Sequence, residues 1–269
     1  MRTNKVAPKP AHLGPNYGAQ FQDHSVASAY FARPPYPPAF FDILETLQSP
    51  IQRGRILELG CGTGDATFGL AARADRIDAV EPSAAMLSVA RCRTGANDTR
   101  IRWLHGTAEQ IEFEGPYSLA VAAESLHWME WDVVLPKIAA ALAPGAFLVV
   151  AERGTREGMP WEAELRDLIS KYSTNRKYRP YDLIMELTSR GLFREIGRCT
   201  TLAAPFSQPI QDHIELIHSR NGFSRARMSA ESAVEFDALY RQLLDRYCAD
   251  DIVRMQTVVE VIWGLPLSA

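Results

Sequence analysis

The sequence contains little that would tie this protein to a membrane, to nucleic acid or to a metal ion. No apolar run approaches the ~18 residues of a bilayer-spanning helix, and the first residues lack the apolar core of a signal peptide. The chain of 269 residues has a net charge of −3, which disfavours extensive contact with nucleic-acid phosphates. Its four cysteines are scattered, and its histidines and acids show no metal-ligand spacing. We therefore expect a cytoplasmic protein without a metal, membrane or nucleic-acid partner.

A glycine-rich stretch, residues 55–64, is the feature that organises the rest of the sequence. Ile56, Leu57 and Leu59 form a short apolar run that predicts a buried strand. Three alternate glycines, Gly60, Gly62 and Gly64, follow it, and residues 65–73 predict a helix. Glycine permits a sharp turn and a close approach of a ligand, and a helix start offers free N–H groups. The stretch predicts a nucleotide-type cofactor site.

Three further strands predict an alternating α/β pattern whose loops meet at one edge of a parallel sheet. Residues 77–81 form a strand that ends in Glu81, 17 residues after Gly64; in dinucleotide-binding folds an acid near this distance binds ribose hydroxyls. A third strand, residues 101–104, leads to Gly106–Glu109, and a fourth, residues 117–123, leads to Glu124. This pattern alone leaves binding of a nicotinamide cofactor open.

Together these residues resemble the class I S-adenosylmethionine (SAM)-dependent methyltransferases. The resemblance rests on the segment from Glu58 to Gly64, on Glu81 with Pro82, on residues 106–109 and on residues 126–128, and it is closest to the small-molecule group that includes trans-aconitate methyltransferases. It implies a three-layer α/β sandwich whose seven-stranded Rossmann-like sheet is mostly parallel. It also implies a last strand that runs antiparallel between the fifth and sixth, and a helical cap.

We expect four segments along the chain. Residues 1–20 should be disordered or loosely packed, and residues 21–151 should form the SAM-binding core with its N-terminal helices. Residues 152–230 should form the helical cap and the sixth strand, and residues 231–269 should complete the core with a long helix and the last strand.

The resemblance implies a set of cofactor-binding residues around the glycine loop. Glu81 would bind the ribose, Glu58 would position the loop or the amino group of SAM, and Ala108 and Glu109 would border the adenine. Met86 would pack on the adenine, or it is an ordinary core methionine; Glu109 is alternatively an acid at a helix start. The full set is Glu58, Gly60, Cys61, Gly62, Gly64, Glu81, Pro82, Met86, Thr107, Ala108, Glu109, Glu124 and Ser125.

The acceptor side is less defined by the sequence. His127 is the candidate catalytic residue, because a neutral imidazole can take a proton from an acceptor; alternatively it shapes the pocket beside Trp128. The resemblance places Tyr30, Arg33 and Tyr36 at the acceptor or the cofactor carboxylate; alternatively they belong to a proline-rich surface turn with a stacked aromatic. Trp128 is either a wall of the methyl-transfer pocket or a core aromatic, and Arg220 and Arg225 are candidates to bind an anionic acceptor. Four cations in residues 171–181 would suit an anionic acceptor, or they form a solvated basic face.

These residues predict transfer of a methyl group from SAM to a small molecule, with S-adenosylhomocysteine as product. O-methylation of a carboxylate or hydroxyl is the first hypothesis. N- or C-methylation in secondary metabolism is an alternative, and so is a cyclase or binding module that holds SAM without transferring its methyl group.

Overall fold

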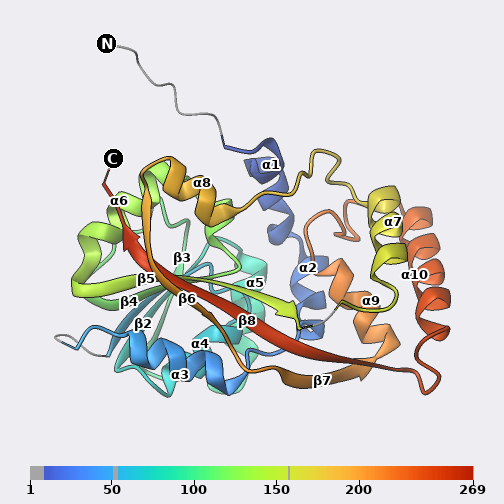
Figure 1. Ribbon diagram of the computed structural model, residues 1–269, viewed down its shortest axis with the longest axis horizontal. Helices are drawn as coiled ribbons and strands as arrows, with labels where there is room; N and C mark the ends of the chain where they lie inside the picture. Colours follow the sequence, from blue (N-terminus) through green and yellow to red (C-terminus); the bar gives the residue numbers. More distant parts are fainter. Residues whose placement is uncertain (1–8, 51–53, 157, 269) are drawn as a thin grey trace, which may run out of the picture.

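An eight-stranded twisted sheet runs through the computed structural model, which describes residues 9–50, 54–156 and 158–268. The strand order is β3-β2-β1-β4-β5-β8-β6, and β7 pairs with the remaining length of β8 (Figure 1). Strands β1 to β5 are parallel to one another, whereas β8 is antiparallel to each of its neighbours. The strands are β1 Arg55–Leu59, β2 Arg76–Glu81, β3 Ile101–His105, β4 Tyr117–Ala123, β5 Leu142–Thr155, β6 Phe193–Thr200, β7 Ala204–Pro209 and β8 Ile252–Pro266.

Helices cover both faces of the sheet. The α-helices are α1 Pro15–Gly18, α2 His24–Ala29, α3 Pro38–Leu47, α4 Asp65–Ala71, α5 Ala84–Cys92, α6 Trp131–Ala141, α7 Glu162–Tyr172, α8 Leu183–Ser189, α9 Ile210–His218 and α10 Ala230–Asp245. Short 3₁₀ turns are η1 Ala11–Leu13, η2 Ala19–Gln22, η3 Tyr30–Ala32 and η4 Leu126–Trp128.

The alternation of side chains along each strand produces two separate cores. In β1, Leu57 belongs to the core under α6 and α8, and Ile56 belongs to the opposite core under α3 and α4. Both residues are at most 1% exposed, because a parallel strand is covered on each face. The result confirms the expected three-layer sandwich and the antiparallel strand between the fifth and sixth.

A third apolar core lies beside the sheet, in what we call the side lobe: α7, α9, α10 and β7, packed on the first half of β8. Figure 1 shows these helices grouped at one end of the molecule. Helix α10, which we expected to complete the main core, packs in this lobe instead, whereas α8 and β6 belong to the main body. Strand β7 was not predicted from the sequence. Its six residues pair with the first part of β8, which at 15 residues is long enough to pair with both β6 and β7.

The N-terminal segment corrects our expectation of a loose start. Residues 1–8, like 51–53, 157 and 269, lie outside the described residues, but residues 11–22 form η1, α1 and η2. His12, Leu13 and Gln20 are at most 4% exposed. Gln20 accepts a hydrogen bond from the Gly222 N–H at 2.9 Å, and α2 contacts both α5 and α9 (Figure 1). The segment is ordered by residues that follow about two hundred positions later, which local patterns do not reveal.

Substitution of Gly264 tests whether β8 packs against β6 as the structure shows. A Cβ at this position would lie 2.2 Å from the Arg194 carbonyl oxygen and 2.6 Å from Phe193 Cζ. We expect Gly264→Ala to lower the free energy of unfolding by about 1–3 kcal/mol, because a buried backbone contact relaxes poorly. Gly154→Ala in β5 is the matched control, since no described atom lies within 4 Å of its Cβ. Equal stability of the two variants in urea titrations would contradict this packing.

Candidate functional site

The glycine loop lies at the point where the strand order reverses, between β1 and β4, which is where open parallel sheets bind ligands. Gly60, Gly62 and Gly64 have φ values of +70°, +56° and +85°, a left-handed backbone that favours glycine. The Gly60 and Cys61 N–H groups both donate to the Val80 carbonyl, at 2.8 and 3.0 Å. The loop is thus anchored to β2 and has little freedom to move.

Gly60 is also confined from the β4 side. A Cβ there would lie 2.5 Å from Ser125 Cβ, and the Ser125 hydroxyl donates to the Leu59 carbonyl. Gly64 performs a different task, because Phe68 and Trp103 cover it and it does not line the cofactor cavity described below. Its assignment as a ligand contact is therefore corrected to one of loop geometry.

Two buried acidic residues, Glu58 and Glu81, lie next to the glycine loop. Glu81 accepts hydrogen bonds from the Gly62 and Ser83 N–H groups at 2.9 and 2.8 Å, and burial raises its pKa to about 7. Burial likewise raises the pKa of Glu58 to about 8. Glu58 Oε2 has no hydrogen-bond partner among the described residues. An orphaned acceptor beside a glycine cradle suits a ligand that carries an amino group, as SAM does.

One cavity, the cofactor cavity, brings most of the predicted residues together. It is lined by Glu58, Gly60, Cys61, Gly62, Glu81, Pro82, Met86, Thr107, Ala108, Glu109, Glu124 and Ser125, and also by Tyr30, Arg33, Tyr36 and Trp128. Met86 is 1% exposed within a small core cluster. The Glu109 carboxylate accepts a hydrogen bond from the Glu130 N–H at 2.7 Å. The sequence did not point to Phe21, Gln22 or Arg153, which also line this cavity.

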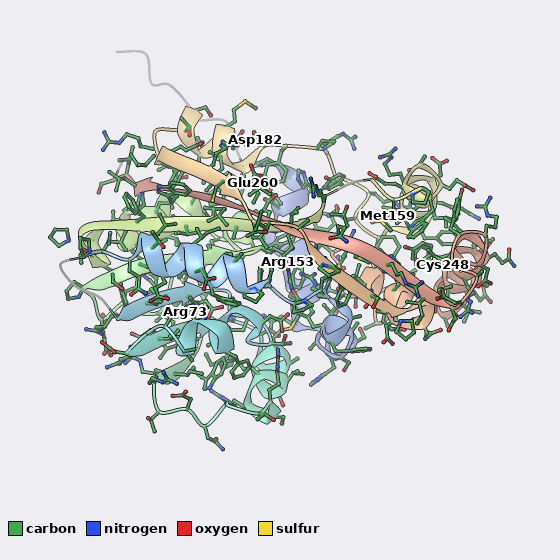
Figure 2. The ribbon with its side chains drawn as sticks, turned by 60° about the horizontal axis from the view of Figure 1, so that its bottom comes forward. Arg73, Arg153, Met159, Asp182, Cys248 and Glu260 are labelled. Carbon is green, nitrogen blue, oxygen red and sulfur yellow. The ribbon has the colours of Figure 1, made fainter. Side chains whose placement is uncertain are left out.

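An ion pair between Glu124 and Arg153 marks the end of the cofactor cavity. Glu124 follows β4 with a φ of 56°, rare for a residue with a side chain. Arg153, on β5, donates from Nε to Glu124 Oε2 at 2.8 Å and stacks over the Tyr36 ring at 4.2 Å; Figure 2 labels it beside β8. Burial opposes ionisation of Glu124, but Arg153 and Arg33 outweigh it and lower its pKa.

Arg33 joins this ion pair to the side lobe. Its guanidinium lies 3.6 Å from Glu124 Oε2 and donates to both the hydroxyl and the carbonyl of Ser219, at 2.9 and 2.8 Å. It also stacks over the Tyr30 ring at 4.1 Å. The Tyr30 hydroxyl has no hydrogen-bond partner among the described residues. Arg33 is thus committed to protein contacts, whereas the Tyr30 hydroxyl remains available to a ligand.

A second cavity of about 670 Å³, the acceptor cavity, lies between the main body and the side lobe. Six residues line both cavities: Phe21, Tyr30, Arg33, Glu124, Trp128 and Arg153. His127 and Arg220 line the acceptor cavity alone, as does Met159, which Figure 2 labels toward the side lobe. Burial lowers the pKa of His127 to about 4, so its imidazole is neutral at pH 7.

Two groups of expected acceptor residues lie elsewhere. Arg225 lines neither cavity, and its guanidinium is bound by Glu215 and Asp237 at 2.6 and 2.8 Å. Of residues 171–181, only Tyr178 reaches the acceptor cavity. Of the cations there, Lys171 pairs with Glu235 of α10 at 3.3 Å, and Arg176 donates to the carbonyls of Ser170 and Lys171. Cations at the surface are solvated, as the alternative interpretation held.

Comparison with known proteins supports the same assignment. Residues 56–145, from β1 through the start of β5, match the family model of a methyltransferase domain. Residues 56–145 therefore carry a methyltransferase domain of the class I SAM-dependent type. SAM is the cofactor of that family, and the glycine loop, Glu58 and Glu81 are the residues that we expect to hold it.

Relatives of this methyltransferase resemble it over part of its length. An uncharacterised methyltransferase of Mycobacterium tuberculosis is 32% identical over 140 residues, which is 52% of this chain and 54% of that protein. The chain therefore spans about half the length of that relative. A proposed type II methyltransferase from Anaeromyxobacter dehalogenans has a similar fold, with a TM-score of 0.61, 22% identity and coverage of 87% and 97% of the two chains. The [4+2]-cyclase SpnF also shares the fold, with a TM-score of 0.54, 18% identity and coverage of 97% and 98%.

Within the described ranges, no helix of the methyltransferase is both long and apolar enough to cross a bilayer. The same residues contain no cluster of three histidine, cysteine or acidic side chains arranged to hold a metal ion.

Gly60→Ala tests whether the cradle holds the cofactor. The added methyl group would force Ser125 and the loop apart, so we expect S-adenosylhomocysteine affinity to fall at least about tenfold. Gly145→Ala is the control: its φ of +75° carries a similar strain of about 1–2 kcal/mol, but no described atom lies within 4 Å. Calorimetric titration measures both. Unchanged affinity in the Gly60 variant would contradict the site.

Glu58→Gln tests the buried acid through the pH dependence of stability. The free glutamate pKa of 4.5 rises to about 8 on folding, so the folded state retains the proton between these values. Stability from this group therefore falls as pH rises from about 5 to 8, by on the order of a few kcal/mol at most. The variant should show a flatter dependence in thermal melts without cofactor. Glu112→Gln, at an exposed position, is the control; identical slopes in all three proteins would refute the assignment.

Proposed function

We propose that the protein transfers the methyl group of SAM to an oxygen of a small organic acceptor and releases S-adenosylhomocysteine. The main observation in support of this proposal is that the cofactor cavity and the acceptor cavity adjoin each other. The cofactor cavity and the acceptor cavity share six residues, so an acceptor in the second cavity can meet the methyl group at their common wall. SAM supplies an electrophilic methyl group, and the chain aligns the acceptor and excludes water.

The size and lining of the acceptor cavity support a small molecule over a polymer. Its volume of about 670 Å³ is within the range of sites that bury most of a small ligand. Its walls come from the N-terminal segment, from the ends of β4 and β5 and from three elements of the side lobe. A protein or nucleic-acid acceptor would need an open groove, and the net charge of −3 gives nucleic acid little attraction. Action in the cytoplasm stays a prediction from the sequence.

The environment of His127 favours an oxygen that is already ionised. With a pKa lowered to about 4 by burial, the imidazole is neutral but binds a proton weakly, and an effective general base has a pKa near the working pH. A carboxylate needs no base, whereas a hydroxyl needs one. We therefore rank methylation of a carboxylate above that of a hydroxyl and assign His127 to positioning.

A cyclase or binding module that uses SAM without consuming it is the second candidate. The fold likeness to a [4+2]-cyclase shows that this architecture accommodates other chemistry, so the fold alone does not decide. Formation of S-adenosylhomocysteine distinguishes methyl transfer from these alternatives. Methylation of a carboxylate is separated from N-methylation by the product, since base hydrolyses a methyl ester and leaves an N-methyl group intact.

The test is a screen for S-adenosylhomocysteine with carboxylic acids, phenols and amines as acceptors. With a carboxylic acid acceptor, we expect His127→Gln to lower kcat less than about tenfold and to leave a flat rate profile from pH 6 to 9. Loss of more than about a hundredfold, the lower end of general-base effects, would make His127 the base. His105→Gln is the control, because His105 is exposed and lines neither cavity. Binding of SAM without turnover in any acceptor class would favour the second candidate.

A further inference from the structure

Arg220 has a cationic group without a partner inside the acceptor cavity. No hydrogen bond, ion pair or aromatic stacking of its guanidinium occurs among the described residues, although the neighbouring Arg33 and Arg153 are both paired. Arg220 is exposed to solvent and lines the acceptor cavity, while surrounding protein and Arg33 lower its pKa. Its guanidinium lacks a counter-ion, and an anion in the cavity would supply one.

His213 provides a neutral donor on the same side of the cavity. The Gln208 side-chain amide lies 2.9 Å from His213 Nδ1. An amide nitrogen only donates, so Nδ1 accepts and the ring proton is on Nε2. Nε2 has no hydrogen-bond partner among the described residues, and the ring lines the acceptor cavity. His213 lies on α9, Arg220 follows the end of that helix by two residues, and both line the acceptor cavity.

We propose that Arg220 and His213 form a recognition subsite for a carboxylate of the acceptor, an inference that rests on the proposed methyl transfer. The guanidinium supplies the charge and two donors, and the Nε2–H of His213 supplies a third donor. Glu152 and Glu162 also line this cavity, and their charge opposes a single group with two negative charges at this subsite, such as a phosphate monoester. The subsite therefore suits a singly charged carboxylate.

The carboxylate at this subsite is recognised and is not the group that is methylated. Neither Arg220 nor His213 lines the cofactor cavity, whereas the shared wall at Tyr30 and Trp128 does. A carboxylate paired with a guanidinium also has its lone pairs engaged, which makes it a poor nucleophile. The acceptor thus carries a carboxylate at one end and the reacting oxygen at another position.

The test compares phenylacetate with its neutral isostere phenylacetamide, titrated into protein saturated with S-adenosylhomocysteine. Wild-type protein should bind the acid at least about tenfold more tightly than the amide, the size expected of a charge-assisted pair. Arg220→Gln should abolish this preference, and Arg220→Lys should retain part of it. His213→Phe should weaken acid binding severalfold, and His213→Gln less, because an amide still donates.

Two controls separate this inference from the proposed function. S-adenosylhomocysteine affinity should stay within about twofold in every variant, since neither residue lines the cofactor cavity, and failure of wild-type protein to bind it would overturn the proposed function itself. Arg100→Gln removes an exposed arginine outside both cavities and should leave the acid preference intact. Provided that the wild-type protein binds S-adenosylhomocysteine, two results would overturn the subsite. One is that wild-type protein binds the acid no more tightly than the amide, or binds neither. The other is that the Arg220→Gln variant still prefers the acid.

Discussion

The ion pair between Glu124 and Arg153 is the constraint on which the arrangement of the two cavities depends. Glu124 occupies a left-handed backbone position after β4, held by a hydrogen bond from its N–H to the Ala151 carbonyl at 2.9 Å. Arg153 binds its carboxylate, donates to the Pro34 carbonyl and approaches Asp65 of α4 at 3.7 Å. Because neither charge tolerates burial without the other, the pair fixes β4, β5 and the N-terminal segment relative to one another.

The N-terminal segment transmits this constraint to the side lobe. Arg33 connects Glu124 to Ser219, the Asn221 amide donates to the Tyr17 carbonyl at 2.7 Å, and Arg227 pairs with Asp23 at 2.7 Å. The same segment supplies Phe21 and Tyr30 to both cavities. The cofactor cavity and the acceptor cavity are therefore covered by one piece of chain.

The cofactor half could be predicted from the sequence because its signals are local. A buried strand, three alternate glycines and an acid after the next strand determine the backbone around Gly60 and Glu81 almost alone. Other features depend on distant contacts: residues 11–22 are held by the loop around Gly222, β7 exists only as a partner of β8, and His213 resembles any core histidine of an amphipathic helix. Arg153 carried a usable signal, since it follows the apolar part of a predicted strand at the edge where ligands bind.

This difference between the halves bears on how acceptor choice can vary. The match to the family model ends at residue 145, and Arg220, His213, Trp161 and Tyr240 of the acceptor cavity all lie beyond it. The glycine cradle is constrained by backbone geometry, where an added methyl group already collides with Ser125. The acceptor cavity is constrained mainly by side chains on the side lobe, which has an apolar core of its own. Substitutions there can change the charge and shape offered to an acceptor while leaving the cofactor site intact, so likeness across residues 56–145 carries more information about SAM than about the acceptor.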